Sequence, residues 1–234
     1  MLVAFGSLSD AEALEEAVQD LTTDVAAELP DWTLRGATLG AEGAIARAFD
    51  GLSPEASVFP LMMSDGWLMR RVLPDALKAA GRGDTPVLTP LGLMPAFRDH
   101  CADMIRVGVA ENGHAAEATT VVLAAHGSAR GPRPAACTRA LAEELARVTG
   151  VRAVVPGYLE EAPFLADALR DAPEPAICLP CFATNAWHVT GDVPQAVREA
   201  CFTGLVLPAA GTVTGVEAII ARDLIAAHGA ARAA

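Results

Sequence analysis

This chain contains an internal duplication, which limits the folds that it can adopt. The N-terminal segment MLVAFGS matches VLAAHGS at an offset of 121 residues, and residues 58–77 match a stretch within residues 177–197 at an offset of 120. The shared landmarks are Pro60 with Pro180, Trp67 with Trp187, Pro74 with Pro194, and Gly92 with Gly211. Because these landmarks keep one order with little drift, they predict two copies of one folding unit.

Each copy has the pattern of alternating strands and helices. In the first copy we expect strands near 1–5, 32–38, 56–62 and 86–91, and helices near 10–29, 42–50, 67–80 and 94–109. In the second copy we expect strands near 120–126, 152–158, 175–181 and 203–208. Alternation of this kind predicts parallel sheets covered by helices on both faces. The fold class is therefore α/β, with two tandem doubly wound parallel-sheet units related by pseudo-two-fold symmetry.

The unit boundary is expected in a polar segment without periodicity. Residues 109–119 (VAENGHAAEAT) have this character, so the predicted units are 1–112 and 113–234. The first helix should begin with a capping box at Ser9, because Glu12 follows three residues later.

Composition excludes several classes of protein. Hydrophobic residues make up 52% of the chain, which favours a large core over disorder. No stretch is apolar enough to span a membrane, and the N-terminus lacks the pattern of a signal peptide, so we expect a cytoplasmic protein. The formal net charge of −12 argues against nucleic acid as a partner.

The five cysteines do not form a convincing metal or redox motif. Cys178 and Cys181 form a CxxC, but they lie within AICLPCFA, an apolar run that is typical of a buried strand. With no second CxxC in the chain, we interpret them as buried thiols and not as zinc ligands.

Three titratable side chains of the second copy follow the ends of predicted strands. His126 follows the apolar run VVLAA, Glu160 follows the second strand, and His188 begins the helix after the third strand. Because ligands of open parallel sheets bind beyond the carboxyl ends of the strands, we expect the three groups to meet at one edge.

The first copy lacks all three groups. Phe5 stands at the position of His126, Leu68 at that of His188 and Gly40 at that of Glu160. A structural role would be expected in both copies, whereas a functional role needs only one, so we interpret the three residues as one functional set.

Two imidazoles and a carboxylate suit a divalent first-row metal. Three ligands leave a coordination position open, and the same imidazoles can accept protons near neutral pH. A site that delivers a metal and collects protons fits metal insertion into a tetrapyrrole, since two pyrrole N–H protons leave as the metal enters.

The motifs AHGS, a Leu-Glu pair after the next strand, and HVTGDVP resemble those of the class II sirohydrochlorin chelatases of the CbiX and SirB type. The resemblance covers nearly the whole chain, as two tandem chelatase-like units. It implies a lyase-type metallochelatase that inserts Co²⁺ or Fe²⁺ into a tetrapyrrole, in cobalamin or siroheme biosynthesis. It also implies that His126 and His188 handle the metal and the pyrrole protons, with Glu160 as a helper in metal binding or proton removal.

Further expectations concern cofactors and substrate. We expect the metal as a substrate, no permanently bound cofactor and no iron–sulfur cluster, because no cluster-binding set of cysteines appears near the C-terminus. The carboxylates of sirohydrochlorin would meet Ser128, Arg130 and Arg133, with Arg70 or Arg71 as further candidates, and the backbone N–H groups at Gly127-Ser128 could bind an anion. The chain is expected to be a monomer or a homodimer, with no membrane partner.

Two alternative functions stay open. One is a protein that binds a metal or tetrapyrrole without turnover. The other is a phosphatase with a nucleophilic histidine, which ranks lower because Ala125 stands where an arginine would be expected before His126.

Overall fold

The computed structural model describes residues 1–5 and 11–233 of the chain. Two compact units are formed, one by residues 1–94 together with 214–234 and the other by residues 95–213. Ser9, where the capping box is predicted, lies outside the described residues. None of the described helices has the length and apolar character that crossing a bilayer requires.

The first unit is built on a parallel sheet with the strand order β2-β1-β3. Its strands are β1 (Leu2–Ala4), β2 (Gly36–Thr38) and β3 (Phe59–Pro60), and its helices are α1 (Ala11–Glu28), α2 (Ala44–Phe49), α3 (Leu73–Ala79) and α8 (Val216–Ala233). The two faces of β2 meet different helices: Gly36 lies against α1, whereas Ala37 joins the core formed with α2 and α3. Helix α8 packs against α1.

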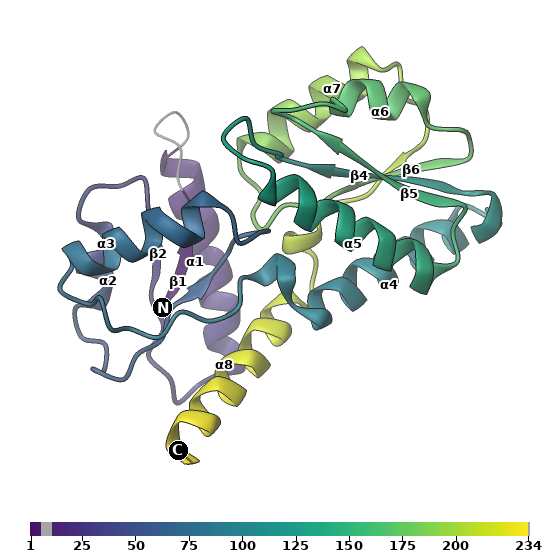
Figure 1. Ribbon diagram of the computed structural model, residues 1–234. Helices are drawn as coiled ribbons and strands as arrows, with labels where there is room; N and C mark the ends of the chain where they lie inside the picture. The colour runs from purple at the N-terminus through teal and green to yellow at the C-terminus, as the bar shows by residue number, and fades with distance from the viewer. Residues whose placement is uncertain (6–10, 234) are drawn as a thin grey trace. The chain divides into compact units, whose positions relative to one another are not determined.

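The second unit has a parallel sheet with the order β5-β4-β6-β7. Its strands are β4 (Thr120–Ala125), β5 (Ala153–Tyr158), β6 (Ala176–Pro180) and β7 (Leu205–Val206). Helices α6 (Leu165–Asp171) and α7 (Val193–Glu199) cover one face, and α4 (Pro95–Glu111) and α5 (Arg133–Thr149) cover the other (Figure 1). The central strand β4 is buried along its whole length, as expected for a strand covered on both sides.

Strands β2-β1-β3 of the first sheet and β5-β4-β6 of the second share one order and one register, and the second sheet adds β7. Leu2 of β1 pairs with Phe59 of β3, and the equivalent Leu123 of β4 pairs with Leu179 of β6. This agreement supports the duplication inferred from the sequence.

The repeats exchange their last helices. Helix α4 belongs to the first repeat in sequence, yet it packs against α5 and β6 in the second unit. Helix α8, from the second repeat, packs in the first unit. The compact units therefore differ from the expected division at residues 112 and 113, because α4 packs on the sheet of the second repeat and α8 packs against α1 of the first.

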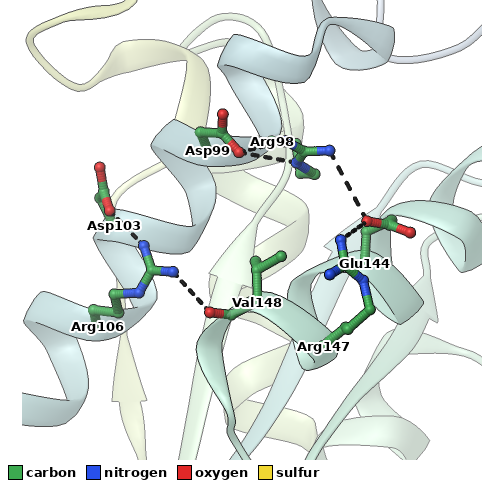
Figure 2. Close-up of polar contacts among 7 residues, drawn as sticks. All are labelled: Arg98, Asp99, Asp103, Arg106, Glu144, Arg147 and Val148. Carbon is green, nitrogen blue, oxygen red and sulfur yellow. Dashed lines mark hydrogen bonds and ion pairs between the residues drawn. The ribbon is translucent and has the colours of Figure 1, made fainter.

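Polar contacts join α4 to α5 (Figure 2). Arg98 lies 3.9 Å from Glu144 across the two helices, and Arg106 donates a 2.7 Å hydrogen bond to the carbonyl of Val148 at the end of α5. Both arginines also pair with an acidic neighbour on α4, namely Asp99 and Asp103. The exchanged helix is thus held by polar contacts as well as by its buried face.

Two element boundaries differ from the sequence prediction. Residues 86–91 form no strand, and Val87 makes only an isolated parallel bridge with Val58. Pro86 and Pro90 bracket this segment, and proline cannot donate to a ladder. The polar stretch at 109–119 is not wholly a linker, because α4 continues to Glu111.

The predicted helix 67–80 is two elements. A π-helix spans Leu68–Val72 and α3 begins at Leu73. The second repeat has the same arrangement, with a π-helix at His188–Asp192 before α7. Pro74 and Pro194 occupy the first turn of the following α-helix, where their missing N–H is tolerated.

Candidate functional site

The carboxyl edge of the sheet in the second unit brings two histidine rings together. His126 directly follows β4, and His188 is the first residue of the π-helix that follows β6. The centroids of the two imidazole rings lie 4.6 Å apart, and the ring planes are at 89°. The sequence prediction that these residues meet at one edge is therefore met by the geometry, although they lie 62 positions apart in the chain.

Oxygen atoms surround the Nδ1 atom of His126. It lies 3.1 Å from the carbonyl oxygen of Gly127 and 3.7 Å from Oε2 of Glu160. Since a carbonyl can only accept a hydrogen bond, the neutral ring carries its proton on Nδ1. The Glu160 side chain is 53% exposed, so its carboxylate is open to water as well as close to the ring.

His188 is held more tightly. Its Nδ1 lies 2.7 Å from Oδ2 of Asp192, one turn further along the π-helix. The ring also stacks on Phe182, with centroids 6.0 Å apart and planes at 24°. Because an ionised carboxylate only accepts, the proton of the neutral ring again belongs on Nδ1. In both histidines the nitrogen that can bind a metal or take up a proton is then Nε2.

The predicted trio is only partly assembled. Glu160 approaches His126, but among residues 1–5 and 11–233 no three His, Cys, Asp or Glu side chains are grouped as a metal site. The arrangement offers two imidazoles with one nearby carboxylate at the strand ends.

Side chains of the second unit contact the loop that follows His126. Gly127 has a φ of +71°, and a Cβ there would lie 2.9 Å from Cβ of Tyr158 and 3.0 Å from Oε1 of Glu161. The backbone N–H of Ser128 donates to Oε1 of Glu161 at 2.7 Å. The backbone N–H of Ser128, which was predicted to bind an anion, therefore already donates to a carboxylate of the protein itself. Helix α5 begins only at Arg133.

Of the other predicted substrate contacts, Ser128 and Arg130 lie on the same loop and Arg133 is the first residue of α5. Arg130 and Arg133 are exposed, and the Ser128 hydroxyl accepts a 3.1 Å hydrogen bond from the backbone N–H of Arg130. Arg70 and Arg71 lie in the π-helix of the first unit, where Arg70 pairs with Asp65.

Sequence reasoning missed two residues that support the site. Asp192, the partner of His188, stands four positions after it, which is a spacing that brings side chains together on a helix. Glu161 had no such signal, because its contact with Ser128 joins residues 33 positions apart.

Two histidines outside the site make contacts of their own. Nε2 of His100 lies 3.2 Å from the carbonyl of Ala210, and the His228 ring contacts Trp32. The landmark residues Trp67 and Trp187 are both more than half exposed.

The cysteines of the CxxC are buried thiols, as expected. Cys178 and Cys181 are 0% and 4% exposed. Burial raises the pKa of Cys178 to about 12. A thiol in this state is a poor metal ligand and a poor nucleophile, since both roles need the thiolate.

The first repeat preserves the backbone of the site without its polar groups. Phe5 directly follows β1, as His126 follows β4, and Leu68 begins its π-helix, as His188 does. The loss of the side chains is therefore not a loss of the local fold.

Comparisons with known proteins agree on one family. The family model CbiX matches residues 120–224, which lie in the second repeat. A solved structure of CbiX, described as the terminal enzyme for biosynthesis of siroheme in denitrifying bacteria, is 40% identical with a TM-score of 0.87, and the match covers 97% of each chain. No curated protein sequence matches the chain.

More distant structures share the fold. SirB from Bacillus subtilis with Fe³⁺ is 15% identical with a TM-score of 0.72, covering 95% of this chain and 93% of that one. The sirohydrochlorin chelatase SirB from Bacillus subtilis subspecies spizizenii, in complex with cobalt, is 14% identical with a TM-score of 0.66, covering 95% and 92%.

Proposed function

Since this chain belongs to the CbiX family, we propose that it is a lyase-type metallochelatase that inserts a divalent metal into sirohydrochlorin. The observation that carries the proposal is the pair of imidazole rings 4.6 Å apart at the carboxyl edge of the second sheet. The 40% identical CbiX acts in siroheme biosynthesis, and this supports Fe²⁺ as the metal, with Co²⁺ as the alternative.

The two histidines have different surroundings, which supports a division of labour. His188 is fixed by Asp192 and Phe182, as suits a ligand that must hold a metal in one position. His126 lies beside the exposed Glu160, as suits a base that accepts a proton and passes it to water. We therefore assign metal delivery to Nε2 of His188 and removal of the pyrrole protons to Nε2 of His126.

The reaction balances with these groups. As M²⁺ enters the ring, its bonds to the pyrrole nitrogens replace two N–H bonds, and the two protons leave one after the other. His126 accepts the first proton on Nε2, passes it to water and then accepts the second, with the carboxylate of Glu160 3.7 Å from Nδ1 beside the transient imidazolium. No electron is transferred, so the metal keeps its oxidation state.

Substrate binding is proposed for the loop that follows His126. Sirohydrochlorin carries many carboxylates, whereas the chain has a net charge of −12, so local cations must offset the repulsion. The exposed Arg130 and Arg133 supply positive charge in the segment that follows His126, and the Ser128 hydroxyl is a further polar group there.

The test is metal insertion followed by the absorbance change of sirohydrochlorin with Fe²⁺ or Co²⁺ under anaerobic conditions. We expect His126→Ala and His188→Ala each to lower the insertion rate about 100-fold or more, the range lost with a general base or a metal ligand. His114→Ala, a histidine outside the site, serves as control. A double reversal, Arg130→Glu with Arg133→Glu, should raise the KM for sirohydrochlorin and leave the KM for the metal nearly unchanged.

Three outcomes would contradict these assignments. An unchanged rate in either histidine variant would overturn the mechanism. Stoichiometric binding of metal and tetrapyrrole by the wild type without turnover would indicate a binding protein instead. An unchanged KM for sirohydrochlorin in the double reversal would remove the two arginines from the substrate site.

A further inference from the structure

We propose that Asp192 is the positioning residue of the site, which holds His188 with its proton on Nδ1 and its Nε2 lone pair directed to the metal. The effect of Asp192 on catalysis rests on the proposed chelatase function. The position of the proton on His188 can be tested without turnover.

The geometry begins with the π-helix His188–Asp192. Residues four apart face each other here, and Oδ2 of Asp192 lies 2.7 Å from Nδ1 of His188. This distance is that of a charge-assisted hydrogen bond. The two side chains are 38% and 33% exposed, so water competes with the bond only in part.

A second donor fixes the carboxylate of Asp192. Nε1 of Trp187 donates to Oδ1 at 3.1 Å, so each carboxylate oxygen has its own partner. The indole reaches this position because Gly191 has no side chain: a Cβ there would lie 2.6 Å from Cε2 of the indole. Asp192 is therefore oriented toward His188 by the same turn of helix, and its oxygens are engaged by two ring N–H groups.

The first repeat shows that this set is not needed for the local fold. Its π-helix Leu68–Val72 aligns with His188–Asp192, and the preceding tryptophan, Trp67, is kept. Yet Leu68, Arg71 and Val72 stand where the second repeat has His188, Gly191 and Asp192. The carboxylate and the glycine are absent together with the imidazole, which is expected if they serve the imidazole and not the helix.

The Asp192 carboxylate affects both the tautomer of His188 and the strength of its Nε2 as a metal ligand. An isolated neutral imidazole favours the tautomer with the proton on Nε2, which leaves no lone pair there for a metal. A carboxylate at Nδ1 reverses this preference and makes Nε2 a stronger donor, and loss of such a partner costs about 10- to 100-fold in metal affinity or activity.

The first experiment measures the tautomer by ¹⁵N NMR of histidine-labelled full-length protein, at a pH where the His188 ring is neutral. In the wild type we expect the His188 proton on Nδ1. In Asp192→Ala it should move to Nε2, whereas Asp192→Asn should retain part of the Nδ1 population, because the amide oxygen still accepts. Asp171→Ala, an exposed aspartate at the end of α6, is the control. A proton that stays on Nδ1 in Asp192→Ala would overturn the proposal.

The second experiment separates positioning from general damage. In metal insertion with Fe²⁺ or Co²⁺, Asp192→Ala should raise the KM for the metal about 10- to 100-fold. The KM for sirohydrochlorin should change little, and a rise in both would count against the proposal. If the wild type inserts no metal at all, the proposed function fails, but the tautomer measurement still decides the role of Asp192.

The same contact can be introduced into the first repeat as a further test. Leu68→His alone should place an imidazole on the equivalent π-helix with its proton on Nε2. Adding Val72→Asp should move that proton to Nδ1. An introduced imidazole whose tautomer does not respond to Val72→Asp would show that the spacing on the π-helix does not produce the contact, and would contradict the proposal.

Discussion

At the scale of single residues, the chemistry of the site depends on where hydrogen-bond acceptors lie around two rings. The sequence predicted His126, His188 and Glu160 because each follows a strand end, and parallel strands end at a common edge. It did not predict that Gly127 and Asp192 would orient the two rings. The four-residue spacing from His188 is a signal for Asp192, whereas the contact of His126 with Gly127 depends on one left-handed backbone position, which single-sequence patterns do not encode.

Gly127 offers a direct test of how the His126 loop is held. Gly127→Ala would place a Cβ 2.9 Å from Tyr158 at a φ of +71°. We expect a loss of about 1–2 kcal/mol in the free energy of unfolding, because a left-handed conformation costs this much for a residue with a Cβ. The insertion rate should fall as well, because the His126 ring is oriented by the carbonyl of Gly127.

Gly131 is the matched control for this prediction. Nothing lies within 4 Å of a Cβ built there. Gly131→Ala should leave the midpoint of urea unfolding close to that of the wild type. Equal effects of the two substitutions would show that the loop adapts, and that its conformation does not position His126.

At the scale of elements, most helices and strands followed from periodicity, and the exceptions have local causes. The fourth strand of the first repeat is reduced to one bridge at Val87, between Pro86 and Pro90. The close approach at Gly92 was visible in the sequence only as a repeated glycine. In the structure a Cβ there would lie 2.5 Å from the backbone of Met63, and one at the equivalent Gly211 would lie 2.4 Å from that of Ala183.

Helix α4 allows the buried and polar contributions to be separated. Ile105 is fully buried, whereas Arg106 is about half exposed and binds Asp103 and the carbonyl of Val148. Ile105→Ala should lower the free energy of unfolding by about 2–5 kcal/mol, the usual cost of a core truncation. Arg106→Ala should cost no more than about 1 kcal/mol, because water screens exposed ion pairs.

Urea unfolding monitored by circular dichroism measures both changes. The substitutions affect adjacent residues of one helix, so a difference in helix propensity cannot explain a large gap between them. A larger loss for Arg106→Ala than for Ile105→Ala would mean that the polar network of Figure 2, and not the apolar face, holds the exchanged helix.

At the scale of the whole molecule, the sequence predicted the duplication but not the exchange of helices. Similar repeats have similar last helices, and the apolar stripe of α4 does not specify which of two related sheets it covers. In the structure Gly108 of α4 lies against Leu205, Leu207 and Ile177 of the second unit. Helix α4 thus completes the unit that contains His126 and His188.

The exchange makes a prediction about fragments. A fragment of residues 95–213 contains every strand and helix of the second unit in one continuous segment. The sequence repeat 113–234 has the same strands but lacks α4 and ends in α8, a helix of the other unit. We expect residues 95–213 to unfold cooperatively in urea with protected amides in β4. Residues 113–234 should show neither property, because the β6 face that α4 covers would be exposed to water. If residues 113–234 folded and residues 95–213 did not, the sequence repeat and not the compact unit would be the folding unit of this chain, and α4 would not be part of the scaffold that positions the two histidines.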